Sequence, residues 1–239
     1  ALKHDQFIDT TKHGLEWASE NRRSVIVTSA ILLLVILVLI GGFALYNYRS
    51  GQASIAFGAA MQDYQTPLAP PGQPVPPGIK TYPTAVARAK AANAEFLAVA
   101  EKYGMTPDGK VARYFAGLTS IEANDNANAE ASLKQVADGW NSNLAALAKL
   151  SLAQLYRQTN RDSEAIELYN QLTAKPTSTV PAGLAQIQLA ELYEAQGNTA
   201  KAKEIYAQLK DKDAKGPVGQ LAAQKLNPAP AGPGGVPAQ

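Results

Sequence analysis

The sequence predicts an all-α protein in which a single transmembrane helix is followed by an α-solenoid of stacked helix pairs. Two observations support this fold class. Residues Val25–Leu45 form an apolar run without a charged side chain, and as a helix this run spans roughly 30 Å, the thickness of a bilayer's hydrocarbon core. Between Lys80 and Leu226 the apolar residues recur with helical spacing, and one five-residue pattern returns after 37 residues. A fixed period of this size is typical of a solenoid.

Changes in composition divide the 239-residue chain into six predicted segments. They are a cytoplasmic N-terminal segment (1–23), a transmembrane helix (24–46), a helical extension (47–65), a Pro-rich linker (66–80), a helix-pair repeat domain (81–226) and a disordered Pro/Gly tail (227–239). The prolines of the linker exclude a helix and favour a semi-rigid polyproline-type connector. The N-terminal segment has a weak apolar stripe, which suits either a helix on the membrane surface or a docking helix for a membrane partner.

Basic residues around the apolar run predict its orientation. Four of them precede the run, among them Arg22 and Arg23, whereas Arg49 alone follows it before Lys80. The positive-inside rule therefore places the N-terminus in the cytoplasm and the large C-terminal part on the other side of the membrane. A cleaved signal peptide, cut near Gly42–Ala44, is the alternative. The apolar run favours an anchor because it is longer than the roughly 7–15 residues of a signal peptide's core.

The helical pattern after the linker predicts a series of short helices. The first has Pro83 in its first turn and ends at Gly104. The others are expected at 109–123, 126–138, 143–158, 162–175, 181–196, 199–209 and 217–226. Asp162 and Thr199 are the predicted N-caps of two of them, because their side-chain oxygens can accept from free backbone N–H groups.

An internal repeat relates the helices in the second half of the chain. Leu152–Tyr156 (LAQLY) aligns with Leu189–Tyr193 (LAELY), 37 residues later. The same separation relates Asn160 to Gly197, Ala165 to Ala202, Tyr169 to Tyr206 and Leu172 to Leu209. Small alanines allow helices to cross closely, and the recurring tyrosines, Tyr156 and Tyr193 included, are expected to fill the core between stacked units.

Two fainter units precede these copies. Ala116 and Leu118 keep the repeat spacing in the helix expected at 109–123. Phe96 and Val99 suit the second helix of a still earlier unit. The first helix of that unit would then be the extension of the anchor.

These residues resemble the tetratricopeptide repeat. The unit 149–172 follows the family's pattern, with Leu152, Ala153, Tyr156, Ala165, Tyr169 and Leu172 at its apolar positions and Asn160 where the family usually has Gly at the turn. The unit 184–209 fits as well, and the resemblance covers about 81–226. Two features depart from the pattern: the period is 37 rather than about 34, and Pro176 and Pro181 are displaced from the family's Pro position. The resemblance implies a scaffold that binds other proteins.

The order of a short cytoplasmic tail, one span and an exported repeat domain also resembles the ancillary subunit of the bacterial Sec translocon. That resemblance implies a single-pass protein of the bacterial inner membrane, with periplasmic repeats that act near the secretion machinery or periplasmic chaperones. The alternative is a structural accessory subunit of a larger, energy-converting membrane complex.

No pattern in the chain indicates catalysis. The sequence has no Cys, and His4 and His13 both precede the apolar run, so the predicted repeats have no His base or ligand. A phosphate-binding loop is also absent, and a net charge of +2 with mixed signs gives no nucleic-acid footprint. We therefore expect no enzyme activity, no cofactor and no bound metal. The expected partners are other proteins and the membrane around Val25–Leu45.

The first helices of stacked pairs are expected to line a concave groove, by the geometry of the family that the chain resembles. The groove positions are Lys110, Arg113, Leu147, Leu150, Gln154, Arg157, Leu184, Ile187, Glu191 and Glu194. They form a basic start, an apolar middle and an acidic end. Peptide binding along this groove is one interpretation, and an ordinary solvated face is the other.

Overall fold

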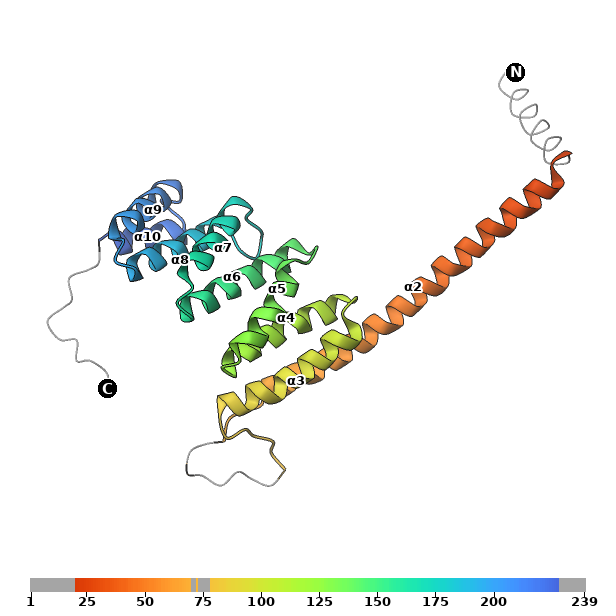
Figure 1. Ribbon diagram of the computed structural model, residues 1–239, viewed down its shortest axis with the longest axis horizontal. Helices are drawn as coiled ribbons and strands as arrows, with labels where there is room; N and C mark the ends of the chain where they lie inside the picture. Colours follow the sequence, from red (N-terminus) through yellow and green to blue (C-terminus); the bar gives the residue numbers. More distant parts are fainter. Residues whose placement is uncertain (1–19, 70–71, 73–77, 228–239) are drawn as a thin grey trace, which may run out of the picture. The chain divides into compact units, whose positions relative to one another are not determined.

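The computed structural model describes residues 20–69, 72 and 78–227, and Figure 1 shows their arrangement. Its helices are α2 (Arg22–Tyr64), α3 (Ala85–Tyr103), α4 (Pro107–Glu122), α5 (Asn126–Ala137), α6 (Ser142–Gln158), α7 (Asp162–Ala174), α8 (Ala182–Ala195), α9 (Thr199–Lys212) and α10 (Pro217–Leu226). The predicted all-α solenoid is confirmed for this part of the chain. Most of the predicted N-terminal segment (1–23) and of the tail (227–239) lies outside the described residues.

The chain divides into two compact units, residues 1–52 and 53–239. The first unit contains the N-terminal part of α2, whose apolar side chains are exposed, as Leu33 at 62% and Phe43 at 68% illustrate. By length and composition alone, α2 is the one helix in the described part of the chain that could cross a membrane. An apolar surface of this extent marks contact with lipid or with another protein.

The second unit begins with the end of α2, which packs as the first helix of a pair. Ala60 and Phe96 are fully buried in one cluster, where α2 meets α3 and α4. The Phe57 ring lies 5.7 Å from the rings of both Phe96 and Phe115, measured between centroids. The packing confirms the expectation that the extension of the anchor pairs with the helix that carries Phe96.

The two ends of the Pro-rich segment are joined by hydrogen bonds, a feature that the prediction of a semi-rigid connector did not include. The Ala69 N–H donates to the Tyr82 carbonyl over 2.8 Å, and the Tyr82 N–H donates to Pro67 over 3.1 Å. Asp63, near the end of α2, accepts hydrogen bonds from the Lys80 ammonium and from the Tyr82 hydroxyl, the latter over 2.6 Å. The segment is therefore a loop within the first helix pair. Residues 70–71 and 73–77 of it lie outside the described part.

The two N-caps predicted from the sequence, Asp162 and Thr199, lie one residue after those that the structure shows. Thr199 is the first residue of α9, and Asn198 is its N-cap, which accepts from the Lys201 N–H over 3.3 Å. Asp162 likewise starts α7 after Arg161, so both predicted N-caps were wrong by one residue. The turns before these helices have left-handed backbone at Asn160 (φ 56°) and Gly197 (φ 76°). Asn and Gly tolerate this conformation best.

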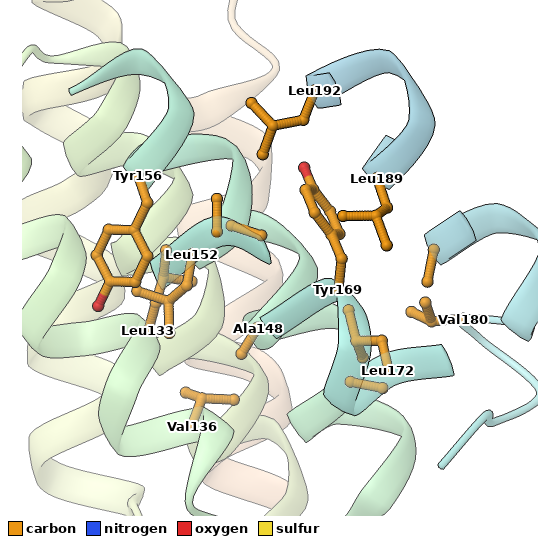
Figure 2. Packing of buried hydrophobic residues seen from close by; sticks show 14 residues of the cluster. Leu133, Val136, Ala148, Leu152, Tyr156, Tyr169, Leu172, Val180, Leu189 and Leu192 are labelled. Atoms are coloured by element: carbon orange, nitrogen blue, oxygen red, sulfur yellow. The ribbon is translucent and has the colours of Figure 1, made fainter. Parts of the chain in front are cut away.

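The main core lies between successive helix pairs, as the repeat predicts (Figure 2). Tyr169 and Tyr206 are fully buried, as are Ala165 and Ala202. Small alanines let the two helices of a pair approach, and the tyrosine rings occupy the space that remains. Tyr193 is only half-buried: it packs against two of the core clusters, and the Lys201 ammonium lies 5.1 Å from its ring centroid.

Candidate functional site

The ten predicted groove residues occupy several separate environments. Lys110 and Arg113 line a hollow of about 200 Å³ at the junction of α3, α4, α5 and α6. We call it the Trp140 hollow; its lining residues are Ala100, Gly104, Gly109, Lys110, Arg113, Gln135, Val136, Gly139, Trp140, Asn141 and Leu144. The Lys110 ammonium lies 4.5 Å from the centroid of the Trp140 ring, and the Trp140 side chain is 83% exposed.

Gln154 and Arg157 line a different, polar hollow of about 560 Å³. Asp162, from the start of α7, and Gln188, from α8, also line it. The Arg157 guanidinium donates to Gln188 Oε1 over 3.4 Å, so this face of α6 is directed at α8. The hollow is water-accessible and mixed in charge, which suits polar contacts more than an apolar anchor.

The predicted apolar middle of the groove is largely covered. Leu147 and Leu150 are half-buried against the main core. Ile187 is 4% exposed and belongs to a cluster with Tyr206 and Ala222, so its prediction as a groove-lining residue was wrong. The reason is that α10 packs on α8 and α9 and covers this position. Leu184, at 37% exposed, remains at the surface.

The predicted acidic end is paired with α10. Lys225 Nζ lies 3.1 Å from Glu191 Oε1 and 3.8 Å from Glu194 Oε2. The Glu194 carboxylate also accepts from the buried Tyr206 hydroxyl over 3.0 Å. These two carboxylates are therefore partly engaged in contacts within the protein, because α10 packs where the first helix of a further pair would lie.

Sequence reasoning missed the residues that complete the Trp140 hollow. Trp140 lies in the turn between α5 and α6, next to Gly139 and before the N-cap Asn141. A tryptophan in a polar turn between two helices was the available signal. It was overlooked because the family geometry directs attention to the first helices of the pairs.

A cluster of charged and aromatic side chains around Glu130 has a structural role. Glu130 of α5 accepts from the Arg161 Nη1 over 2.6 Å and from the Tyr156 hydroxyl over 3.0 Å. The hydrogen bonds from Arg161, ahead of those from Lys134 and Tyr156, lower the pKa of Glu130 to about 2 against the opposing effect of burial. The Arg161 guanidinium covers the Tyr156 ring at 4.1 Å. This cluster connects α5 to the α6–α7 turn of the next pair.

No group of three or more His, Cys, Asp or Glu side chains that could hold a metal occurs among residues 20–69, 72 and 78–227. The hollows described above are lined by hydrogen-bonding, charged and apolar side chains. Their arrangement on stacked helix pairs defines the class of protein: a helical-repeat scaffold.

Comparison with known families identifies the kind of repeat. The family model described as "Tetratricopeptide repeat-like domain" matches residues 16–228, and the chain belongs to this family. Repeats of this kind generally bind other proteins and typically serve as non-catalytic scaffolds. No curated protein matches the chain.

Solved structures show the same fold. A crystal structure from Podosopora anserina, described as a putative kinesin light chain with nearly identical TPR-like repeats, is 17% identical in sequence, with a TM-score of 0.54. The match covers 74% of this chain and 84% of that one. The crystal structures of that putative kinesin light chain and of its single-residue variant match with the same values.

Proposed function

We propose that this chain is a single-pass protein of the bacterial inner membrane whose repeat domain binds other proteins outside the cytoplasm. The observation that supports the proposal is α2, because one helix contains the exposed apolar run and also supplies Ala53–Tyr64 to the first helix pair. Lipid is an environment that accepts such a run.

The orientation rests on the basic residues Arg22 and Arg23 before the apolar run. A protease added to spheroplasts tests it. The repeat domain should then be digested while an N-terminal epitope tag stays protected. Protection of the repeats together with digestion of the tag would overturn the orientation.

The proposed partners are the secretion machinery, exported polypeptides or periplasmic chaperones. A photo-crosslinking amino acid at Gln154, which is exposed beside Arg157, tests this in native membranes. The matched control carries it at Gln208, exposed on α9. Crosslinks to translocon subunits or to exported polypeptides from Gln154 but not from Gln208 support the proposal. Absence of protein crosslinks from both positions contradicts it.

A structural subunit of a larger membrane complex is the second candidate. The observation in its favour is apolar exposure beyond the predicted span, with Tyr48 at 67% and Ile55 at 70% exposed. Such side chains suit a permanent neighbour. Native electrophoresis after mild detergent extraction separates the two candidates, because a structural subunit stays in one complex of fixed stoichiometry.

A further inference from the structure

The Trp140 hollow differs from an ordinary solvated surface in its apolar lining. Val136 of α5 and Leu144 of α6 form part of its wall, beside Trp140 in the turn between these helices. Trp140 is 83% exposed, and Met105, which follows the lining residue Gly104, is 88% exposed. Trp140 is thus a large apolar side chain of the lining that is left in water. Tryptophan is among the residues that most often dominate protein–protein binding energy.

The charges at this hollow have one sign. Lys110 and Arg113 are the charged members of the lining, and neither forms an ion pair with a carboxylate in the part of the chain that the structure describes. Lys110 instead lies over the Trp140 ring. Both cations therefore remain available to an anionic group from outside the chain.

The positive lining continues on the other side of Gly139. A second hollow, of about 380 Å³, shares Gly139 with the first and is lined by Lys149 and Lys175 without an acidic residue. Lys149 donates to Gln171 Oε1 over 3.1 Å, which leaves its charge without a carboxylate partner in that lining. The polar hollow at Arg157 also contains Asp162. The two hollows that share Gly139 differ from it because their charged residues are all cationic.

We propose that the Trp140 hollow binds an extended acidic segment of a partner protein. One apolar side chain of the segment enters the hollow beside Trp140 and Leu144, and flanking carboxylates pair with Lys110 and Arg113. The segment then continues past Gly139 towards Lys149 and Lys175. This inference rests on the proposed function, because it names the chemistry of the partner that the repeat domain binds.

The size of the hollow favours one side chain over a cofactor. Its volume of about 200 Å³ is close to that of a cavity of about 150 Å³ that holds benzene, and below the roughly 300 Å³ at which small-molecule sites begin. The concave shape also favours a protruding side chain over a flat lipid surface. Because the charged lining residues are cationic, anionic lipid is the competing occupant that the test must exclude.

Trp140 provides a fluorescence signal for the test. The full chain carries Trp17→Phe, so that Trp140 is the single tryptophan, and is held in phosphatidylcholine nanodiscs. The probe is the peptide Gly-Glu-Asp-Phe-Asp-Glu-Gly with blocked ends, and its matched control has Gln and Asn in place of Glu and Asp. We expect the acidic peptide to change Trp140 emission and to bind at least tenfold more tightly than the amide peptide.

Two charge variants identify the hollow. Lys110→Glu with Arg113→Glu should weaken binding of the acidic peptide at least tenfold, and Lys110→Gln with Arg113→Gln should weaken it less. Lys203→Glu with Lys210→Glu makes the same change in net charge on exposed positions of α9 and should leave binding unchanged. Circular dichroism verifies that each variant keeps its helix content.

Three results would overturn the proposal. They are equal binding of the acidic and amide peptides, acidic-peptide binding that survives the Lys110 and Arg113 changes, and a Trp140 response to phosphatidylglycerol vesicles without one to the peptide. The proposed function has its own readout. If the crosslinks from Gln154 persist in the Lys110→Glu and Arg113→Glu variant while the peptide fails to bind, protein binding stands and the assignment of this hollow is wrong.

Discussion

Two tyrosines at the same repeat position differ in their hydroxyl partners, and this difference predicts unequal changes in stability when each is replaced by Phe. Tyr169 and Tyr206 lie 37 residues apart and are both fully buried. The Tyr206 hydroxyl donates to Glu194. The residue that corresponds to Glu194 one repeat earlier is Arg157, whose guanidinium has donors only. The buried Tyr169 hydroxyl therefore has no acceptor for its proton in the described part of the chain. Burial raises the pKa of Tyr169, and the nearby Arg157 guanidinium, a donor, partly offsets this rise.

The two Tyr→Phe variants therefore remove different free energies. A hydrogen bond to a charged acceptor contributes about 1.5–3 kcal/mol, and a buried polar group without a partner costs about 1–3 kcal/mol. The Glu194 side chain is 39% exposed, so water can replace the lost donor. We expect Tyr206→Phe to lower the free energy of unfolding by about 1.5 kcal/mol, near the low end. Tyr169→Phe should be neutral or should raise it by up to about 1 kcal/mol.

Urea unfolding of the full chain in detergent, followed by far-ultraviolet circular dichroism, measures the difference. A slope of about 2 kcal/mol per molar urea converts a gap of about 2 kcal/mol into midpoints about 1 M apart. The tyrosines serve as each other's control, because the change in side-chain volume is identical. Equal loss of stability in both variants would refute the reasoning, since it would mean that the Tyr169 hydroxyl is also stabilised.

Three further predictions concern the electrostatics and packing of the repeats. The folded-state pKa of Glu130 is lowered to about 2, mainly by Arg161. Its contribution to stability is therefore present above the unfolded pKa of about 4.3 and is lost as pH falls towards 2. In urea titrations at several pH values, Glu130→Gln should make the free energy of unfolding depend less on pH in this range. Gly117→Ala should lower the thermal midpoint at a cost of about 1–3 kcal/mol, because a Cβ there lies 2.6 Å from Cγ of the buried Leu133. Gly58→Ala, where a Cβ has no neighbour within 4 Å, should instead raise the free energy of unfolding by up to about 1 kcal/mol. Calorimetry measures both thermal midpoints. Asp63→Asn should weaken the contacts of Lys80 and Tyr82 at the base of the loop and increase amide hydrogen exchange at Tyr82.

Each of these predictions has an outcome that contradicts it. An acid-stability profile that is unchanged in Glu130→Gln would show that the ion pair with Arg161 does not contribute. Equal effects of the two Gly→Ala changes would contradict the close approach of α4 to α5 at Leu133. Unchanged exchange at Tyr82 in Asp63→Asn would mean that the backbone hydrogen bonds of Tyr82 with Pro67 and Ala69 close the loop by themselves.

The repeat itself could be predicted from the chain because its spacing reports local structure. The 37-residue separation identified the buried Ala165 and Ala202, and Tyr169 with Tyr206, before their contacts were known. Helix ends were predicted within a few residues. The cap assignments failed at Asp162 and Thr199 because they depend on backbone turns at Asn160 and Gly197, which spacing does not report.

The candidate surfaces were predicted less well, because exposure depends on elements distant in the chain. Periodicity identified Ile187 as a member of one face of α8, but α10 covers that face. Lys110 and Arg113 were selected, whereas Trp140 was missed, since the turn that carries Trp140 meets α4 only after the pairs stack.

The amino-acid sequence by itself determined the apolar run, the helical class and the repeat, because hydrophobicity and periodicity are properties of contiguous residues. Tertiary structure decided that α10 covers Ile187, that the two ends of the Pro-rich loop meet, and that Trp140 and Lys110 share a hollow. These outcomes depend on which faces meet when helices stack, and burial of apolar surface between distant segments selects those faces.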